Sequence, residues 1–271
     1  SAPPAVVPTS PAAAQLATAE TGANSPGPGP AIAFDGALTH RIGFEIRGTG
    51  LNATNNPVYT WVPATGSTTA LPLRRDVVNT AECAACHDKL AFHGGPRTDV
   101  QYCVVCHNPG TIDPQSGNSV DMKVMVHKIH MGNKLPTVVA AGNTTPAAGK
   151  GYTIWGNSLS YWNFNPIVFT QDVRNCTTCH RESDTSTPQA SNWRTTINSE
   201  SCGTCHDDVN FQTGVNHGGI GATDADCATC HGPTATTNNG ALRVAEAHKM
   251  PLVEAAKKAG KFKDEIAPVT I

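Results

Sequence analysis

The stretch Cys83–His107, CAACHDKLAFHGGPRTDVQYCVVCH, together with VMVHKIHMG at residues 124–132, decides how this chain folds. It holds two copies of the motif C-x-x-C-H. In c-type haem attachment, the two thiols of this motif bond the porphyrin and the histidine binds the iron. Three more copies follow, and the five motifs use all ten cysteines. The predicted attachment cysteines are Cys83, Cys86, Cys103, Cys106, Cys176, Cys179, Cys202, Cys205, Cys227 and Cys230, and the predicted proximal ligands are His87, His107, His180, His206 and His231.

Two other uses of paired cysteines were weighed against haem. Zinc ribbons also contain C-x-x-C pairs, but zinc does not require histidine directly after the second cysteine. Here that position is histidine in all five copies. Five disulfides are a poor alternative, because each would close a loop of only two residues. The sequence therefore predicts five covalently bound haem c groups.

The remaining histidines supply enough distal ligands for every iron. Of the 11 histidines, five belong to the motifs, which leaves His40 and five others. His40 lies far before the first motif in an alternating stretch, so we expect it to be the spare. Methionine could also bind iron, but three of the four methionines lie within three residues of a candidate histidine, where packing is the simpler role. The predicted distal ligands are His93, His127, His130, His217 and His248.

An internal repeat gives these histidines roles. CHDKLAFHGG at residues 86–95 resembles CHDDVNFQTGVNHGG at residues 205–219, which makes His93 and His217 equivalent. A His-Lys pair follows the second motif and another follows the fifth. This suggests that His127 and His248 are equivalent and leaves His130 for the central motif. The segment VDMKVMVHKIHMG has helical spacing and ends at Gly132, so the rings of His127 and His130 should share one face of a helix. Two irons would then lie close together.

The composition is unusual for a globular protein and favours a fold organised by haem. Only 6% of the 271 residues are aromatic, whereas Gly (25) and Pro (20) are abundant. A core built from so few large side chains would be thin, and five porphyrins would supply the missing apolar bulk. The predicted fold is a multihaem cytochrome c that is mostly coil, with short α-helices packed around five haems and a small β segment near the N-terminus.

Charge and hydropathy bear on the partners. The net charge is −2 and no basic run exceeds two residues, which argues against a nucleic-acid partner. No apolar run is long enough to span a membrane. Haem attachment of this type occurs outside the cytoplasm, so we expect an exported protein located at the cell surface, with the periplasm as the second choice.

The flanks of the motif region differ from it in composition. Residues 1–30 form a Pro- and Ala-rich extended tail, and residues 31–72 contain a short β-strand segment with alternating apolar and polar side chains. We expect the pentahaem domain at residues 73–250 and a helix and strand tail at residues 251–271.

Aromatic side chains are concentrated in the long segment between His130 and Cys176, which we expect to be a loop. They are Tyr152, Trp155, Tyr161, Trp162, Phe164 and Phe169. One interpretation is a docking face for an electron acceptor or a flavin. The other is a lid that packs against the porphyrin faces, and we favour it because aromatic clusters more often bury area than bind ligands.

The run LPLRRDVVNTAECAACHDKLAFHGGPRTDVQYCVVCHNPG, the later VHKIHMG and the segment from NHGG to CATCH resemble the outer-membrane decahaem cytochromes of metal-reducing bacteria, the OmcA/MtrC type. The resemblance covers about three quarters of the chain. It implies modules of five bis-histidine haems alternating with β-barrel domains. It also implies electron transfer to minerals, flavins or other cytochromes outside the cell. This chain departs from the pattern in having one pentahaem module, so it is either a fragment or a shortened relative that assembles end to end.

The predicted ligands indicate a carrier of electrons rather than an enzyme. An iron with two imidazoles has no open position, so electrons would pass by outer-sphere transfer to external acceptors, to other multihaem cytochromes or along a chain of assembled copies. The alternative is a multihaem reductase of the nitrite or hydroxylamine type with one open haem site. Such enzymes often carry a C-x-x-C-K motif, and none of the five motifs here ends in lysine.

Overall fold

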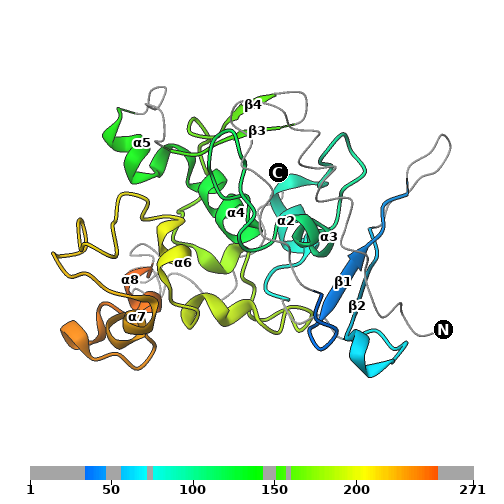
Figure 1. Ribbon diagram of the computed structural model, residues 1–271. Coiled ribbons are helices and arrows are strands. Elements are labelled where there is room, and N and C mark those ends of the chain that lie inside the picture. Colours follow the sequence, from blue (N-terminus) through cyan, green and yellow to red (C-terminus); the bar gives the residue numbers. More distant parts are fainter. Residues whose placement is uncertain (1–33, 47–55, 72–75, 143–150, 157–159, 250–271) are drawn as a thin grey trace, which may run out of the picture.

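The computed structural model describes residues 34–46, 56–71, 76–142, 151–156 and 160–249. In these ranges, short helices and two small hairpins are joined by long irregular segments (Figure 1). The mostly coil architecture and the β segment near the N-terminus agree with the sequence prediction. The predicted tails at 1–30 and 251–271 lie outside the described residues. Among the described helices, none is long and apolar enough to cross a bilayer.

Helical turns carry the cysteine motifs. α2 (Thr80–His87), α3 (Val100–Cys106), α6 (Ser199–Gly203) and α7 (Asp224–His231) carry all or part of four motifs, and the 3-10 turn η4 (Cys176–Thr178) begins the central one. Each of the four helices begins after a capping residue that stands four positions before the first cysteine. These caps are Asn79, Asp99, Asn198 and Thr223. Because residues three apart share a helix face, a turn started at this position directs both thiols to one side.

The central helix α4 (Met122–Met131) carries His127 and His130. The Asp121 carboxylate accepts a hydrogen bond from the Lys123 amide and caps its start. Gly132, with φ of 44°, ends it as the sequence predicted. A 3-10 turn, η2 (Gly132–Lys134), leads into the short helix α5 (Pro136–Ala140), which begins with proline at its first position.

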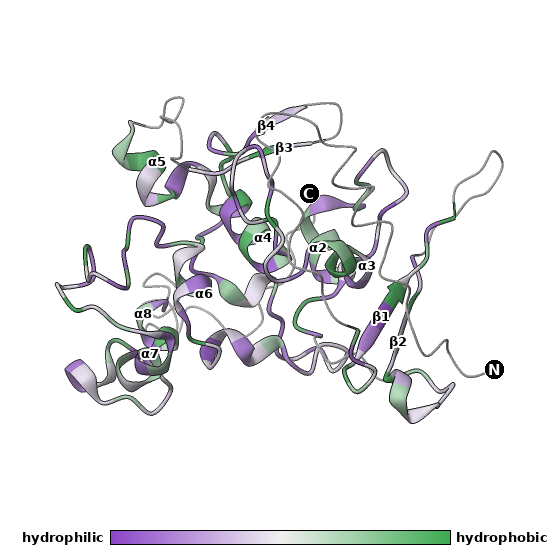
Figure 2. Cartoon of the chain, in the orientation of Figure 1, coloured by the Kyte–Doolittle hydropathy of each residue, from purple (hydrophilic) through white to green (hydrophobic). Residues whose placement is uncertain are grey.

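The fully buried core of the described residues is small and lies on one side of α4. Leu135, Val138 and Tyr152 have no exposed surface, and Met125 and Ile129 of α4 pack against them. Figure 2 shows hydrophobic and hydrophilic residues interleaved along most of the chain, without a continuous apolar layer. A core this limited is what the composition predicted.

The N-terminal hairpin packs beside the second motif. β1 (His40–Gly43) and β2 (Val58–Trp61) pair antiparallel with His40 opposite Trp61, and the 3-10 turn η1 (Pro63–Thr65) follows. The Arg41 guanidinium donates a hydrogen bond to the Gln101 side chain of α3. Gly43 lies so close to the Tyr102 ring that a methyl group there would overlap it. The strands predicted for this segment are therefore present, and they flank the motif region.

The segment between His130 and Cys176 is more ordered than the loop that the sequence suggested. It contains α5 and the antiparallel hairpin of β3 (Thr153–Trp155) and β4 (Tyr161–Asn163). The expected aromatic patch is divided. Tyr152 and Phe164 belong to the core, the Phe169 ring lies 5.5 Å from that of His130, and Trp155, Tyr161 and Trp162 are exposed. The aromatic residues therefore do not form one surface.

The C-terminal third wraps the last two motifs in short turns. The 3-10 turn η5 (Ala190–Arg194) precedes α6, and η6 (Thr237–Gly240) and α8 (Val244–Ala247) follow α7. Figure 1 shows α7 and α8 together at the end of the molecule opposite the β1–β2 hairpin, with α4 and α6 between them. The motifs are thus spread across the molecule.

Candidate functional site

The structure places the histidine rings in five separate pairs. Each pair joins one motif histidine to one histidine from elsewhere in the chain, and no histidine is used twice. The ring centroids are 5.9 Å apart for His87 and His130, 6.0 Å for His107 and His93, 6.1 Å for His180 and His127, 6.2 Å for His206 and His248, and 6.0 Å for His231 and His217. The ten histidines in these pairs are the ten that the sequence analysis predicted as ligands.

The spacing within the pairs fits axial coordination of a haem iron. An imidazole nitrogen bonds a first-row metal at about 2 Å and lies about 1.1 Å from its ring centroid, so two rings on opposite sides of one iron are about 6 Å apart. Unrelated aromatic pairs also occur at such distances. The informative feature is the one-to-one match, because chance contacts would not give every motif histidine a single partner from outside the motifs.

The pairing corrects two expectations from the sequence. We expected His130 to serve the central motif, but its ring faces His87 of the first motif, whereas His127 faces His180 of the central motif. The expected equivalence of His127 and His248 is also wrong. His248 faces His206 of the fourth motif, which is the first motif of the second repeat copy. Its counterpart in the first copy is therefore His130, which faces the first motif. The equivalence of His93 and His217 agrees with the structure, since His93 faces the second motif and His217 faces the fifth, which are the second motifs of the two repeat copies.

Hydrogen bonds of the imidazoles support the same equivalences between the two repeat copies. Nδ1 of His130 and Nδ1 of His248 each bond the carbonyl four residues earlier, at 2.8 and 2.7 Å. Nδ1 of His107 and Nδ1 of His231 each bond a carbonyl in the loop that follows, those of Val120 and Leu242, both at 2.8 Å. A carbonyl only accepts, so Nδ1 must carry the proton, which leaves the Nε2 lone pair free to bind a metal.

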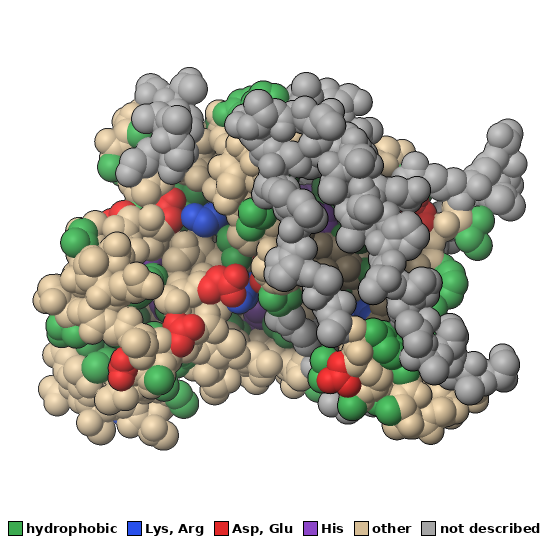
Figure 3. Space-filling view, viewed as in Figure 1, with side chains coloured by type: hydrophobic (Ala, Val, Ile, Leu, Met, Phe, Trp, Pro, Cys, Tyr) green, Lys and Arg blue, Asp and Glu red, His purple; other side chains and the backbone are tan. Residues whose placement is uncertain are grey.

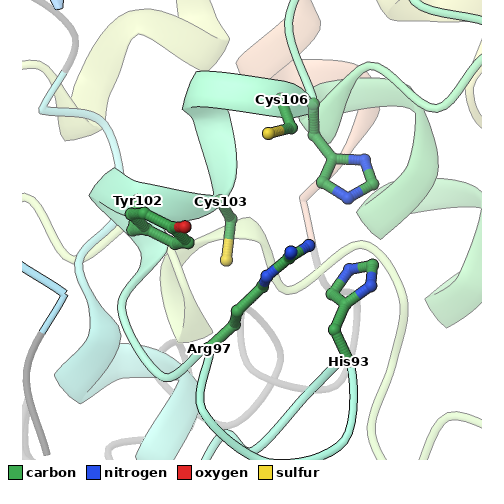
Figure 4. Close-up of a pocket in the computed structure, with 6 residues that line it drawn as sticks. His93, Arg97, Tyr102, Cys103 and Cys106 are labelled. Atoms are coloured by element: carbon green, nitrogen blue, oxygen red, sulfur yellow. The ribbon is translucent and has the colours of Figure 1, made fainter. Parts of the chain in front are cut away.

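The second motif shows how the chain assembles one such site. One small cavity is lined by His93, Arg97, Tyr102, Cys103, Cys106 and His107, and in Figure 4 the Arg97 side chain extends between the Cys103 thiol and the His93 ring. His93 has a φ of 52°, a left-handed conformation that costs free energy in a residue with a side chain. Nε of Arg97 pairs with the Glu45 carboxylate at 2.8 Å, which links this site to the N-terminal hairpin.

The central pair is the most buried of the five. Burial lowers the pKa of His127 to about 4, with a smaller contribution from His180. Burial also lowers the pKa of His180. Both rings are therefore neutral at pH 7, which is the state that can bind a metal. Nδ1 of His127 and Nδ1 of His180 are buried and have no hydrogen-bond partner among the described residues.

Neighbouring thiols show which motifs lie next to each other. Burial raises the pKa of Cys83 to about 11, and Cys179 and Cys103 add to the rise. Burial likewise raises the pKa of Cys176 to about 11, with Cys205 adding to it. Burial raises the pKa of Cys202, with Cys227 as its neighbour. These electrostatic effects indicate that the first motif lies near the second and the central one, the central motif near the fourth, and the fourth near the fifth.

The remaining predicted residues have clear positions as well. All ten cysteines are described, and none forms a disulfide. His40 lies in the N-terminal hairpin between the rings of Phe34 and Trp61, and its Nε2 bonds the Asp35 carbonyl, so it is apart from the five pairs. Among the described residues, no group of three or more His, Cys, Asp or Glu side chains is arranged to hold a metal ion without further ligands.

Some residues that build the site were not predicted from the sequence. The helix caps four positions before the cysteines are one group, and their signal was a polar side chain at a constant spacing. The Lys128–Asp207 ion pair is another. No local pattern points to it, because its two members lie far apart in the chain.

Comparison with known proteins identifies a family. The model of the family described as outer membrane cytochrome MtrC/MtrF-like, domains II/IV, matches residues 75–249. The chain belongs to this family.

Individual proteins are also similar to this chain. The multiheme cytochrome MtrC of Shewanella baltica (strain OS185) is 27% identical over 174 residues, which are 63% of this chain and 20% of that protein. The solved structure of the outer membrane decaheme cytochrome OmcA matches with a TM-score of 0.63 and 26% identity, covering 84% of this chain and 30% of that one. MtrC from Shewanella baltica OS185 matches with a TM-score of 0.55 and 25% identity over the same shares.

The MtrC/MtrF-like chain therefore has the fold of a multihaem cytochrome c, as its sequence predicted. It spans about a fifth of the curated relative and less than a third of each of the two solved chains.

Proposed function

We propose that this chain is an electron-transfer module that carries five covalently bound haem c groups, each held between two histidines. The observation that carries the proposal is the pairing of the five motif histidines with five others at ring separations of 5.9 to 6.2 Å. A bound haem with imidazole on both faces supplies a one-electron ferric/ferrous couple and leaves no open position for a substrate. The cysteines would attach the porphyrins, and the paired histidines would hold the irons.

The chain's own contacts suggest the order of the sites. The thiol neighbours support a path that runs from the second motif to the first, then to the central, fourth and fifth motifs. α4 supports the middle of this path, because His127 faces the central motif and His130 faces the first. Residues three apart on a helix are neighbours, so two adjacent sites share one rigid support. We propose that this order is the route of the electrons.

Membership of the MtrC/MtrF-like family supports a location and a class of partner. We propose that the protein is exported to the cell surface, and that it passes electrons to extracellular acceptors or to other multihaem cytochromes, with assembly of copies into a chain as a further possibility. We also propose residues 73–250 as the pentahaem domain. Figure 3 shows charged side chains of both signs in separate spots on the face in view, with no continuous basic area there.

Haem counting and spectroscopy test the proposal directly. A pyridine haemochrome assay on the secreted protein should give five haems per chain, and the intact mass should exceed the polypeptide mass by five haem groups. Electron paramagnetic resonance of the oxidised protein should show low-spin ferric signals. A haem count of four or fewer, or a high-spin signal from one fifth of the iron, would overturn the assignment, and the high-spin signal would favour a reductase with an open site.

A further inference from the structure

A buried ion pair lies where the central helix meets the fourth motif. Nζ of Lys128 is 3.6 Å from an Asp207 carboxylate oxygen, and the two side chains are 15% and 6% exposed. Lys128 directly follows His127, and Asp207 directly follows His206. The pair therefore links the residue after the proposed distal ligand of the central motif to the residue after the proposed proximal ligand of the fourth motif.

The Asp207 carboxylate is held in place by three groups from two elements. One oxygen accepts a hydrogen bond from the Thr137 amide at 3.0 Å and the other from the Thr137 hydroxyl at 2.5 Å, both in α5. Lys128 approaches from α4. The two donors and the cation hold the carboxylate in one position, and its low exposure limits the screening of its charge by salt.

The charges of this pair reach the fourth motif. Burial raises the pKa of Cys205, while Lys128 lowers it and Asp207 raises it. Burial lowers the pKa of the His206 ring, and Asp208 and Asp207 act in the opposite direction. Asp208 is exposed, so salt will weaken its effect, whereas that of Asp207 will persist.

We propose that Asp207 and Lys128 set the reduction potential of the fourth site in opposite directions. This inference rests on the proposed haem at that motif. An oxidised site carries one more positive charge than a reduced site, so a nearby carboxylate stabilises the oxidised form and lowers the potential. A nearby ammonium raises it.

A second ion pair that also involves a lysine of α4 provides the matched control. Lys123 of α4 pairs with Glu200 of α6 at 2.5 Å, but the side chains are 25% and 48% exposed. Glu200→Gln therefore removes a charge of the same sign at a position where water and salt screen it. Asp207→Asn keeps the shape of the side chain and can still hydrogen bond with Thr137, so the fold should survive.

Spectroelectrochemical titration of the haem-loaded protein in about 0.5 M salt, where exposed charges are screened, tests the proposal. Asp207→Asn should raise one of the five potentials by an amount equivalent to roughly a tenfold change in electron occupancy, about 59 mV for a one-electron couple. Lys128→Gln should lower the same potential, and the double variant should lie between the single variants. Glu200→Gln should leave all five in place.

The result that overturns the inference is a shift for Asp207→Asn no larger than that for Glu200→Gln, or shifts of the same sign for Asp207→Asn and Lys128→Gln. A role confined to folding would lower the melting temperature without moving one potential selectively. Haem content is measured on the same samples. If the fourth motif carries no haem, the proposed function fails, whereas unchanged potentials with five haems present refute only the role of the ion pair.

Discussion

The substitution Val138→Ala tests whether the small core beside α4 holds His127 and His130 of that helix in place. Val138 is fully buried against Leu135 and Tyr152 in the cluster on which Met125 and Ile129 of α4 pack. Removing its two methyl groups loses about 0.8 kcal/mol of transfer free energy for each and leaves a cavity, for a total loss of about 2.5 kcal/mol. For a chain of this size, the melting temperature should fall by about 5–10 °C.

The adjacent residue offers a matched control. Val139 is in the same helix and is 54% exposed, so Val139→Ala should change the free energy of unfolding by less than about 0.5 kcal/mol. Thermal unfolding followed by far-ultraviolet circular dichroism and by the low-spin haem absorbance measures both variants. In Val138→Ala, about two fifths of the low-spin absorbance should be lost before the rest, because α4 carries the distal ligands of two of the five proposed sites. Equal melting temperatures for the two variants, or loss of all five signals in one step, would refute this reasoning.

Two further predictions concern the same helix. His127→Ala and His130→Ala should each convert one fifth of the iron to high spin in the electron paramagnetic resonance spectrum, whereas His40→Ala, whose ring contacts Phe34 and Trp61 instead, should convert none. Gly132→Ala should destabilise the protein by more than 2 kcal/mol in urea unfolding, because the added methyl group would overlap the Ile167 carbonyl at the end of α4. Gly142 also has a positive φ but has open space around it, so a loss for Gly142→Ala equal to that of Gly132→Ala would contradict the steric explanation.

The five cysteine motifs and the ten histidines that pair in the structure could be identified from the sequence because the attachment motif is local. A thiol, a second thiol and an imidazole within five residues form a recognisable unit, and the five units account for every cysteine. Counting then left six histidines, and the position of His40 identified the spare. The end of α4 was also predictable, since Gly132 tolerates the left-handed conformation that stops a helix.

The matching of His127 and His130 to their partners could not be predicted, because the two rings lie on one helix and either could reach either site. The rotation of α4 decides the matching. Packing of Met125 and Ile129 against Leu135, Val138 and Tyr152 fixes that rotation, and those contacts come from segments outside the helix. The His-Lys repeat was misleading, because it aligned His127 with His248, while the hydrogen bond to the carbonyl four residues earlier marks His130 as the counterpart.

The sequence by itself determined the five C-x-x-C-H motifs, the histidines available to face them and a composition too poor in large side chains for an ordinary core. Tertiary structure alone decided which histidine faces which motif, the order of the motifs across the molecule and the placement of Lys128 against Asp207. The physical reason is distance along the chain. Attachment requires only neighbouring residues, whereas pairing depends on how segments tens of residues apart pack around one short helix.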